Sequence, residues 1–121
     1  MNVFDASALL AYILGEEGAD TVRTGLAEGG FCGAANWSEV AQKVRTRDGN
    51  WELAQTLLNS YKLIVEPVTQ ADAELAAKLW RAGTGLSLAD RLCLALAERM
   101  DAVAWTADKA WSKSTRARQI R

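Results

Sequence analysis

The sequence contains no histidine, and this absence excludes more kinds of chemistry than any other feature of the composition. Ser-His-Asp and Cys-His nucleophilic sites need an imidazole, as does any site with a histidine base or metal ligand. The only two cysteines, Cys32 and Cys93, lie far apart in apolar stretches and lack the paired spacing of a zinc site. We expect two buried thiols in a reducing cytoplasm rather than a disulfide. Chemistry must therefore come from carboxylates, hydroxyls, amines or a metal ion held by oxygen.

Glycine and proline are also sparse, with nine and one residues, which excludes collagen-like and disordered compositions. No apolar run approaches the roughly 20 residues of a membrane-spanning helix, and the first residues lack the basic segment of a secretory signal. The 121 residues, half of them hydrophobic, suit one compact domain. We therefore expect a single domain over residues 1–121, located in the cytoplasm and without a membrane partner.

The charges are unevenly distributed, although the net charge is only −1. Residues 1–42 contain a single basic residue, Arg23, whereas residues 109–121 contain no acidic one. This asymmetry suggests a basic tail that meets a polyanion, and a solvated charged end explains it equally well.

Short apolar strands alternate with amphipathic helices along the chain, and no hairpin turn separates them. The strands are expected at 3–4, 31–34, 63–65, 102–105 and 119–120, the last a very short edge strand. The helices are expected at 7–14, 19–28, 37–47, 51–58, 69–80, 87–97 and 109–113. Asn36, Thr69 and Ser87 are predicted N-caps, with an acid three residues on in the capping-box position. This alternation predicts an α/β domain with a parallel sheet.

Four acids follow strands or begin helices in this pattern. Asp5 and Asp108 come after the first strand and the strand at 102–105, while Glu39 and Asp90 lie in the first turns of predicted helices. Strand carboxyl ends and the following helix amino ends share one edge of a parallel sheet, so the four side chains are expected there. Each also has a simpler interpretation as a capping or turn acid. Asp90 fits that interpretation least, because a charge on an apolar, buried helix is costly unless it is paired, hydrogen-bonded or bound to metal.

Clustered carboxylates repel one another and raise their own pKa values unless a cation neutralises them. Oxygen ligands suit Mg²⁺ or Mn²⁺, which bind phosphate oxygens and make bound water a usable nucleophile. Ser7 and Thr106 could orient that water or a carboxylate. With no histidine present, metal-assisted phosphodiester hydrolysis fits these residues best.

The segments around the acids resemble the motifs of PIN-domain nucleases. Residues 3–10 (VFDASALL) resemble the first motif, residues 36–40 (NWSEV) the second, residues 86–91 (LSLADR) the third and residues 105–108 (WTAD) the fourth. The ordered set spans essentially the whole chain, and the closest likeness is to VapC-type toxins of bacterial toxin–antitoxin pairs.

This resemblance implies a PIN-like three-layer domain with a central parallel sheet flanked by helices, and an endoribonuclease that cuts structured RNA. Asp5, Glu39, Asp90 and Asp108 would surround one or two Mg²⁺ or Mn²⁺ ions, with Thr106 nearby. It also implies a homodimer and a small antitoxin that blocks the acidic cleft.

Several other residues are candidates for contact with RNA. Arg91 is expected either to touch the scissile phosphate or to pair with a carboxylate. Candidate contacts to the RNA backbone, each of which can equally be solvated surface, are Lys43, Arg45, Arg47, Lys109, Lys113, Arg116 and Arg118. Trp111 is the best candidate for stacking on a base. The other tryptophans, at positions 37, 51, 80 and 105, are expected in the core or in a dimer contact.

Three alternatives to a nuclease remain. A receiver-type phosphoacceptor would normally carry adjacent acids after the first strand, where this chain has Ala6 and Ser7. A haloacid-dehalogenase-like phosphatase would carry a second acid in place of Ser7. A PIN-like fold kept only as a binding scaffold is also possible from the sequence, although all four acids are present.

Overall fold

The computed structural model of the protein describes residues 1–111, 114 and 116–121. Within these residues the strands form one parallel sheet in the order β3-β2-β1-β4-β5. The strands are β1 (Asn2–Phe4), β2 (Gly30–Gly33), β3 (Leu63–Glu66), β4 (Val103–Thr106) and β5 (Ala117–Gln119). The predicted α/β class with a parallel sheet is confirmed, and the last edge strand is as short as expected.

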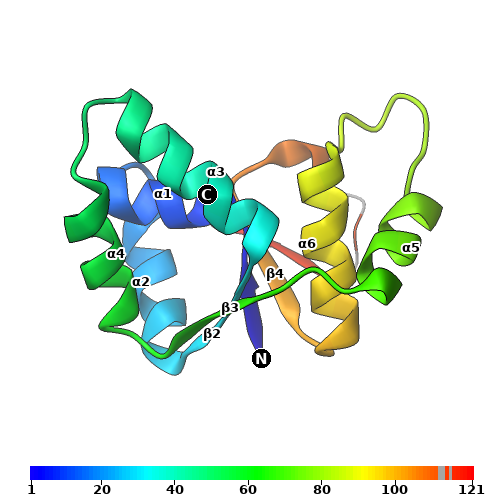
Figure 1. Ribbon diagram of the computed structural model, residues 1–121, viewed down its shortest axis with the longest axis horizontal. Coiled ribbons are helices and arrows are strands. Elements are labelled where there is room, and N and C mark those ends of the chain that lie inside the picture. The colour runs from blue at the N-terminus through cyan, green and yellow to red at the C-terminus, as the bar shows by residue number, and fades with distance from the viewer. Residues whose placement is uncertain (112–113, 115) are drawn as a thin grey trace.

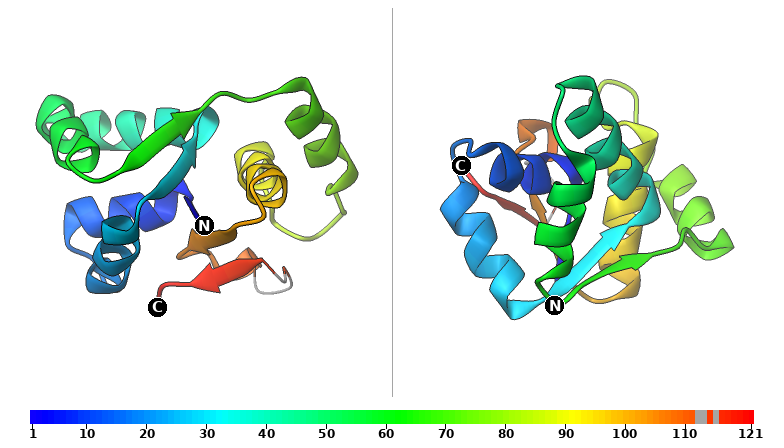
Figure 2. Two further views of the ribbon diagram at one scale, coloured as in Figure 1. Left: turned by 90° about the horizontal axis from the view of Figure 1, so that it is seen from below. Right: turned by 60° about the vertical axis from the view of Figure 1, so that its left-hand side comes forward.

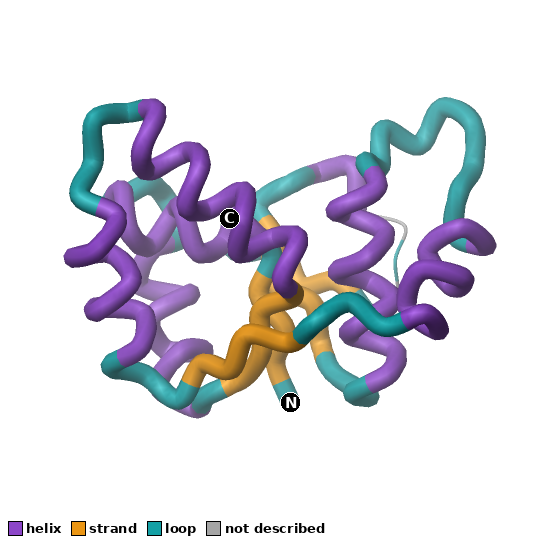
Figure 3. The backbone as a smooth tube through the Cα atoms, viewed as in Figure 1, coloured by secondary structure: helices purple, strands orange, loops and turns teal. Residues whose placement is uncertain are grey.

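Helices cover both faces of this sheet. They are α1 (Ala6–Leu14), α2 (Ala19–Glu28), α3 (Ala34–Thr46), α4 (Trp51–Asn59), α5 (Gln70–Lys78), α6 (Leu88–Arg99) and the 3-10 turn η1 (Lys109–Trp111). Figure 1 shows α1 to α4 on one side of the strands and α5 and α6 on the other, and Figure 2 shows the same division from two more directions. The strands form the middle layer, coloured orange in Figure 3. The predicted three-layer arrangement is confirmed.

Alternating side chains of β1 and β4 divide the core into two clusters, one on each face of the sheet. Phe4 and Trp105 point towards α1 to α4, with ring centroids 5.4 Å apart. Val3 and Ala104 belong to the other cluster, which includes Cys93 of α6. Successive residues of a strand face opposite sides, so each short strand contributes to both clusters and fixes where its carboxyl end lies.

Two of the three predicted helix caps are confirmed. The Thr69 side chain accepts a hydrogen bond from the Asp72 backbone N–H, and the Ser87 side chain accepts one from that of Asp90. In both cases the acid accepts a bond from the cap residue's N–H and completes a capping box. The predicted cap at Asn36 is wrong. α3 begins three residues earlier, at Ala34, because Gly33 passes directly from β2 into the helix without a loop.

The tryptophans are distributed differently from the prediction. Trp51 and Trp105 are buried and Trp37 is half-buried against the core, as expected. Trp80 is 59% exposed and therefore does not belong to the core, and its alternative, a dimer contact, stays a prediction. Trp111 is only 1% exposed, so the prediction that it stacks on a base is wrong. The η1 turn folds Trp111 back into the cluster around α6.

The cysteines and the apolar segments of the chain are as follows in the structure. Both cysteines are buried and unpaired, as predicted. Within the described residues, no helix combines the length and apolar character needed to cross a membrane.

Candidate functional site

The four predicted acids lie at the carboxyl edge of the sheet or in the helices that start there. Asp5 joins β1 to α1, and Asp108 lies between β4 and η1. Asp90 is in the first turn of α6, while Glu39 is in the second turn of α3, because that helix begins earlier than predicted. In Figure 1 the starts of α1, α3 and α6 and the segment after β4 lie around the upper ends of the strands.

Asp5 is the most deeply buried of these acids, with 3% of its surface exposed. As the N-cap of α1 it accepts a hydrogen bond from the Ala8 backbone N–H at 2.8 Å. The Ser7 hydroxyl lies 2.7 and 2.9 Å from its two carboxylate oxygens and donates to the carboxylate. The Thr106 hydroxyl of β4 donates to Asp5 Oδ2 at 2.6 Å. All these donors are neutral, so no cation among the described residues is paired with this carboxylate.

Burial therefore raises the pKa of Asp5 from its ordinary value of 3.8 to about 6. The bonds from Thr106, Ala8 and Ser7 lower the pKa and offset part of this effect, while the negative charge of Asp90 raises it further. A carboxylate held in this way is electrostatically strained at neutral pH. A cation placed beside it would relieve that strain.

Glu39 and Asp90 belong to the same electrostatic cluster as Asp5. The pKa of Glu39 is raised mainly by its partial burial and also by Asp90, against the opposing effect of Lys43. Burial raises the pKa of the Cys93 thiol, and Asp5, Asp90 and Glu39 all add to that shift. The negative charges of these three acids therefore act on the same region, between the carboxyl end of β1 and the start of α6. One oxygen of Asp90 is engaged in the cap, accepting a bond from the Ser87 backbone N–H at 2.9 Å. The capping interpretation of Asp90 is therefore correct, and it coexists with membership of the cluster.

Asp108 is connected to this cluster through Thr106. The Thr106 hydroxyl, which donates to Asp5, accepts a bond from the Asp108 backbone N–H at 3.0 Å. The Asp108 carboxylate itself accepts a bond from the Ala110 backbone N–H at 2.9 Å, at the start of η1. Ser7 and Thr106, predicted as auxiliary residues, both contact Asp5, and their hydroxyl oxygens lie 3.3 Å apart.

The ligand chemistry of this edge fits a hard divalent cation. The donors are carboxylate oxygens with overlapping negative fields, and the most buried of them has no cationic partner among the described residues. The side chains do not form a ready-made metal cage, because within the described residues no three acidic or cysteine side chains stand close enough to hold an ion together. Mg²⁺ usually keeps several waters and needs only one or two carboxylates. The residues therefore fit the predicted metal chemically but do not fix its coordination.

Asn36 is a residue of this edge whose role the sequence did not reveal. Its side chain is 2% exposed, accepts a hydrogen bond from the Ala6 backbone N–H and donates one to the Ala89 carbonyl, both at 3.2 Å. These partners are distant in the chain. The capping-box pattern with Glu39 suggested a local role instead.

Arg91 forms no ion pair with a carboxylate among the described residues, and its contact with the scissile phosphate stays a prediction. Its guanidinium donates to the Ala76 carbonyl of α5 at 2.8 Å, and its Nε is buried without a hydrogen-bond partner among the described residues. Arg91 therefore ties α6 to α5.

Most of the predicted RNA contacts have partners within the chain. Arg45 pairs with Glu52, Arg47 with Glu16, and Arg116 with Asp101. Arg118 lies over the Trp105 ring, and Lys109 donates to the Arg121 carbonyl. Lys43 is exposed, and its positive charge lowers the pKa of Glu39, so among the predicted basic residues it is one that lies near the cluster. Lys113 lies outside the described residues.

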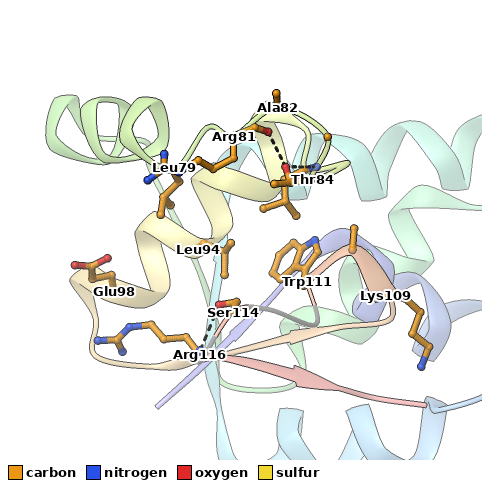
Figure 4. Close-up of a pocket in the computed structure, with 13 residues that line it drawn as sticks. Leu79, Arg81, Ala82, Thr84, Leu94, Glu98, Lys109, Trp111, Ser114 and Arg116 are labelled. Carbon is orange, nitrogen blue, oxygen red and sulfur yellow. Dashed lines mark hydrogen bonds between the residues drawn. The ribbon is translucent and has the colours of Figure 1, made fainter.

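A cavity of about 700 Å³ is lined by none of the four acids. It is enclosed by the segment between α5 and α6, by α6 itself and by η1. Figure 4 shows Leu79, Leu94 and Trp111 around its apolar part, with Arg81 and Lys109 towards its rim. The four acids are therefore not part of the lining of this cavity.

Comparison with known proteins supports the fold. The family model described as PIN domain matches residues 3–116. A search of curated proteins gives no significant match. The chain is similar to a solved toxin–antitoxin complex from Klebsiella pneumoniae, with a TM-score of 0.83, 18% identity, and coverage of 100% of this chain and 98% of that one. It is also similar to Mycobacterium tuberculosis VapC20, a toxin that cleaves the sarcin–ricin loop, with a TM-score of 0.75, 19% identity and 95% of each chain covered.

Proposed function

The chain belongs to the PIN-domain family, and from this premise we propose that it is a Mg²⁺- or Mn²⁺-dependent endoribonuclease that serves as the toxin of a toxin–antitoxin pair. The observation that carries the proposal is the carboxylate of Asp5, which is buried at the edge of the sheet beside other acids and without a cation partner among the described residues.

The metal would be held by Asp5, Glu39 and Asp90, with Asp108 as the fourth acid of the site. When bound, such an ion supplies a water of lowered pKa and neutralises the charge that develops on the phosphate. Ser7 and Thr106 hold the Asp5 carboxylate in one orientation through their hydroxyls. The caps at the starts of α6 and η1 hold one oxygen each of Asp90 and Asp108. Attack by water predicts products with 5′-phosphate and 3′-hydroxyl ends.

The partners follow from the same proposal. The two similar structures are a toxin–antitoxin complex and a toxin that cleaves RNA. We therefore extend to this chain an RNA substrate, a small antitoxin that covers the acids, a homodimeric state and a cytoplasmic location. Lys43 is the basic residue best placed to contact RNA, because it already acts on Glu39.

The direct test is cleavage of total bacterial RNA by metal-stripped protein before and after addition of Mg²⁺ or Mn²⁺. Asp90→Asn is the informative variant, because an asparagine keeps an oxygen for the Ser87 cap while removing the charge. Asp48→Asn is the matched control on an exposed turn. We expect discrete, metal-dependent fragments from wild type and the control and none from Asp90→Asn.

Two other outcomes would contradict the proposal. Products with 2′,3′-cyclic phosphates would exclude attack by water, because they require the ribose hydroxyl as nucleophile. No cleavage by folded, metal-loaded protein would favour a binding scaffold or a phosphoacceptor, and labelling with acetyl phosphate separates those two. For the toxin role, expression of the wild type should arrest bacterial growth, whereas Asp90→Asn should not.

A further inference from the structure

One buried amide links the elements that carry three of the acids. Asn36 lies on α3 and accepts a hydrogen bond from the Ala6 N–H, the residue directly after Asp5. The same side chain donates to the Ala89 carbonyl, the residue directly before Asp90. Both bonds are 3.2 Å long and bridge 30 and 53 residues of sequence. The third acid, Glu39, is three residues further along α3, and residues spaced in this way lie on neighbouring positions of one helix side.

Asp90 repels both of the other acids. The charge of Asp90 raises the pKa values of both Asp5 and Glu39, so their elements are held together against an unfavourable interaction. Core packing holds α1, α3 and α6 to the sheet. Asn36 adds direct bonds at the backbone next to the acids, where a small shift changes the distance between carboxylates.

An amide is suited to this position because it accepts and donates at the same time. An alanine makes neither bond. An aspartate of nearly the same shape keeps the acceptor for Ala6 but turns a second acceptor towards the Ala89 carbonyl. Since Asn36 is only 2% exposed, water cannot easily replace the lost partner.

We propose that Asn36 is a positioning residue of this site, which fixes the backbone segments of Asp5, Glu39 and Asp90 relative to one another so that their carboxylates can converge on a divalent cation. The inference rests on the proposed function, because it takes the acids to be metal ligands. It adds a residue that contacts neither metal nor substrate and acts through the backbone of its neighbours.

The chain offers a matched control in Asn2, at the opposite end of β1. Asn2 is also buried, at 8% exposure, and its amide also links distant elements. It donates to the Gly25 carbonyl and accepts a bond from Trp105 Nε1. Replacing either asparagine by alanine removes a buried bridging amide, but only Asn36 bonds next to the acids.

The test is the affinity of metal-stripped protein for Mn²⁺, measured by calorimetry or by electron paramagnetic resonance of free Mn²⁺. We expect Asn36→Ala to weaken binding by about 10- to 100-fold, the size typical of residues that orient metal ligands. Asn2→Ala should lower the melting temperature to a similar extent. It should change Mn²⁺ affinity by less than about twofold, because Asn2 makes no bond next to the acids. Equal losses of affinity in both variants would show a general effect of destabilisation and overturn the proposal.

Asn36→Asp covers the case in which the alanine variant does not fold. Charge alone would make this variant bind Mn²⁺ more tightly, whereas loss of the Ala89 bond should make it bind more weakly, so the two explanations predict opposite signs. Tighter binding by Asn36→Asp, or unchanged binding by Asn36→Ala, overturns the positioning role alone. Absence of Mn²⁺ binding by the wild type would instead overturn the proposed function, and this inference with it.

Discussion

Two buried aspartates, Asp5 and Asp72, have different partners, and the difference separates a candidate site from a structural ion pair. Both are almost fully buried, at 3% and 4% exposure, and both accept backbone N–H bonds at the start of a helix. Asp72 also accepts two bonds from the Arg99 guanidinium, at 2.9 and 3.1 Å. Burial raises the pKa of Asp72, but the bonds from Arg99 and Thr69 outweigh it and leave that pKa lowered.

Asp5 is as little exposed to solvent, but it lies deeper among protein atoms and has no guanidinium partner among the described residues, and its pKa is raised to about 6. Two causes separate the aspartates: desolvation is the largest effect on the pKa of Asp5, whereas at Asp72 the bonds from Arg99 and Thr69 outweigh a smaller desolvation. A nearby cation is therefore one way in which this fold stabilises a buried carboxylate. Around Asp72 the chain supplies that cation itself, and Arg99 also reaches Glu66 at 3.6 Å. At Asp5 no such cation is found within the described residues. A charge left without its counter-ion is typical of a site that binds one from solution.

Replacing Asp5 by asparagine should have the largest effect and should change activity and stability in opposite directions. We expect RNA cleavage to fall by more than about 100-fold, which exceeds the usual loss for residues that only orient a ligand. The metal-free protein should become more stable at pH 7 to 8, by up to about 3 kcal/mol, since a shift of about 2 pKa units no longer opposes folding. Cleavage assays and urea unfolding measure the two effects. If metal-free Asp5→Asn is less stable than the metal-free wild type at pH 7 to 8, then the Asp5 carboxylate does not destabilise the fold and the contrast with Asp72 fails.

The contributions of Asp5 and Asp72 to the free energy of unfolding should depend on pH in opposite directions. The folded-state pKa of Asp5 lies above its ordinary value of 3.8, so its favourable contribution is complete below about pH 4 and is lost as pH rises through about 6. Asp72 has the opposite sign: its pKa is lowered, so its contribution is present above its ordinary pKa and is lost as pH falls through the lowered value. Subtracting the Asp5→Asn unfolding curve from that of the wild type isolates the Asp5 contribution, which we expect to change by about 3 kcal/mol between pH 4 and pH 8. A flat difference would show that Asp5 is not strained.

Removing the charge of Asp72 should lower the free energy of unfolding and leave the rate of RNA cleavage nearly unchanged. Asp72→Asn loses charge-assisted bonds to Arg99, which we expect to cost about 2 kcal/mol of unfolding free energy at pH 7. Cleavage per folded molecule should stay within about twofold, because Asp72 lies outside the carboxylate cluster. Urea unfolding and initial cleavage rates on the same preparation test this. A loss of cleavage without a loss of stability would place Asp72 in the site and remove the contrast.

The parts of this molecule that the sequence predicted are those determined by neighbours in the chain. The capping boxes at Thr69 and Ser87 need only residues three positions apart, and both are present. The short β5 and the parallel strands follow from apolar runs and the absence of hairpin turns. The placement of the four acids at one edge follows from the geometry of parallel sheets, without knowledge of strand order.

The features that the sequence did not predict depend on distant partners. Asn36 was interpreted through Glu39, yet its bonds reach Ala6 and Ala89. Arg91 was considered beside Asp90, although its side chain turns to the Ala76 carbonyl. Trp111 follows a basic segment in the sequence but is buried against α6 by the η1 turn. In each case the side chain's contacts depend on tertiary packing against residues that the local pattern does not contain.

Ser7→Ala should have the smallest effect and gives the finest test of how Asp5 is held. The Ser7 hydroxyl donates to Asp5 and accepts a bond from the Ala107 N–H at 2.9 Å, so it connects the carboxylate to the segment after β4. We expect cleavage to fall by about tenfold. Because the bond from Ser7 lowers the pKa of Asp5, its removal should raise that pKa, and protons should compete better with the metal. The loss of Mn²⁺ affinity should therefore be greater at pH 6 than at pH 8.

Ser60→Ala is the matched control, because its hydroxyl donates to the Leu57 carbonyl at the end of α4, on an exposed part of the molecule. It should leave both the cleavage rate and its pH dependence unchanged. A loss of Mn²⁺ affinity in Ser7→Ala that is the same at pH 6 and pH 8 would mean that Ser7 only shapes the loop. The electrostatic strain on Asp5 would then depend on burial, Thr106 and the helix cap alone, and its contrast with Asp72 would not need the Ser7 hydroxyl.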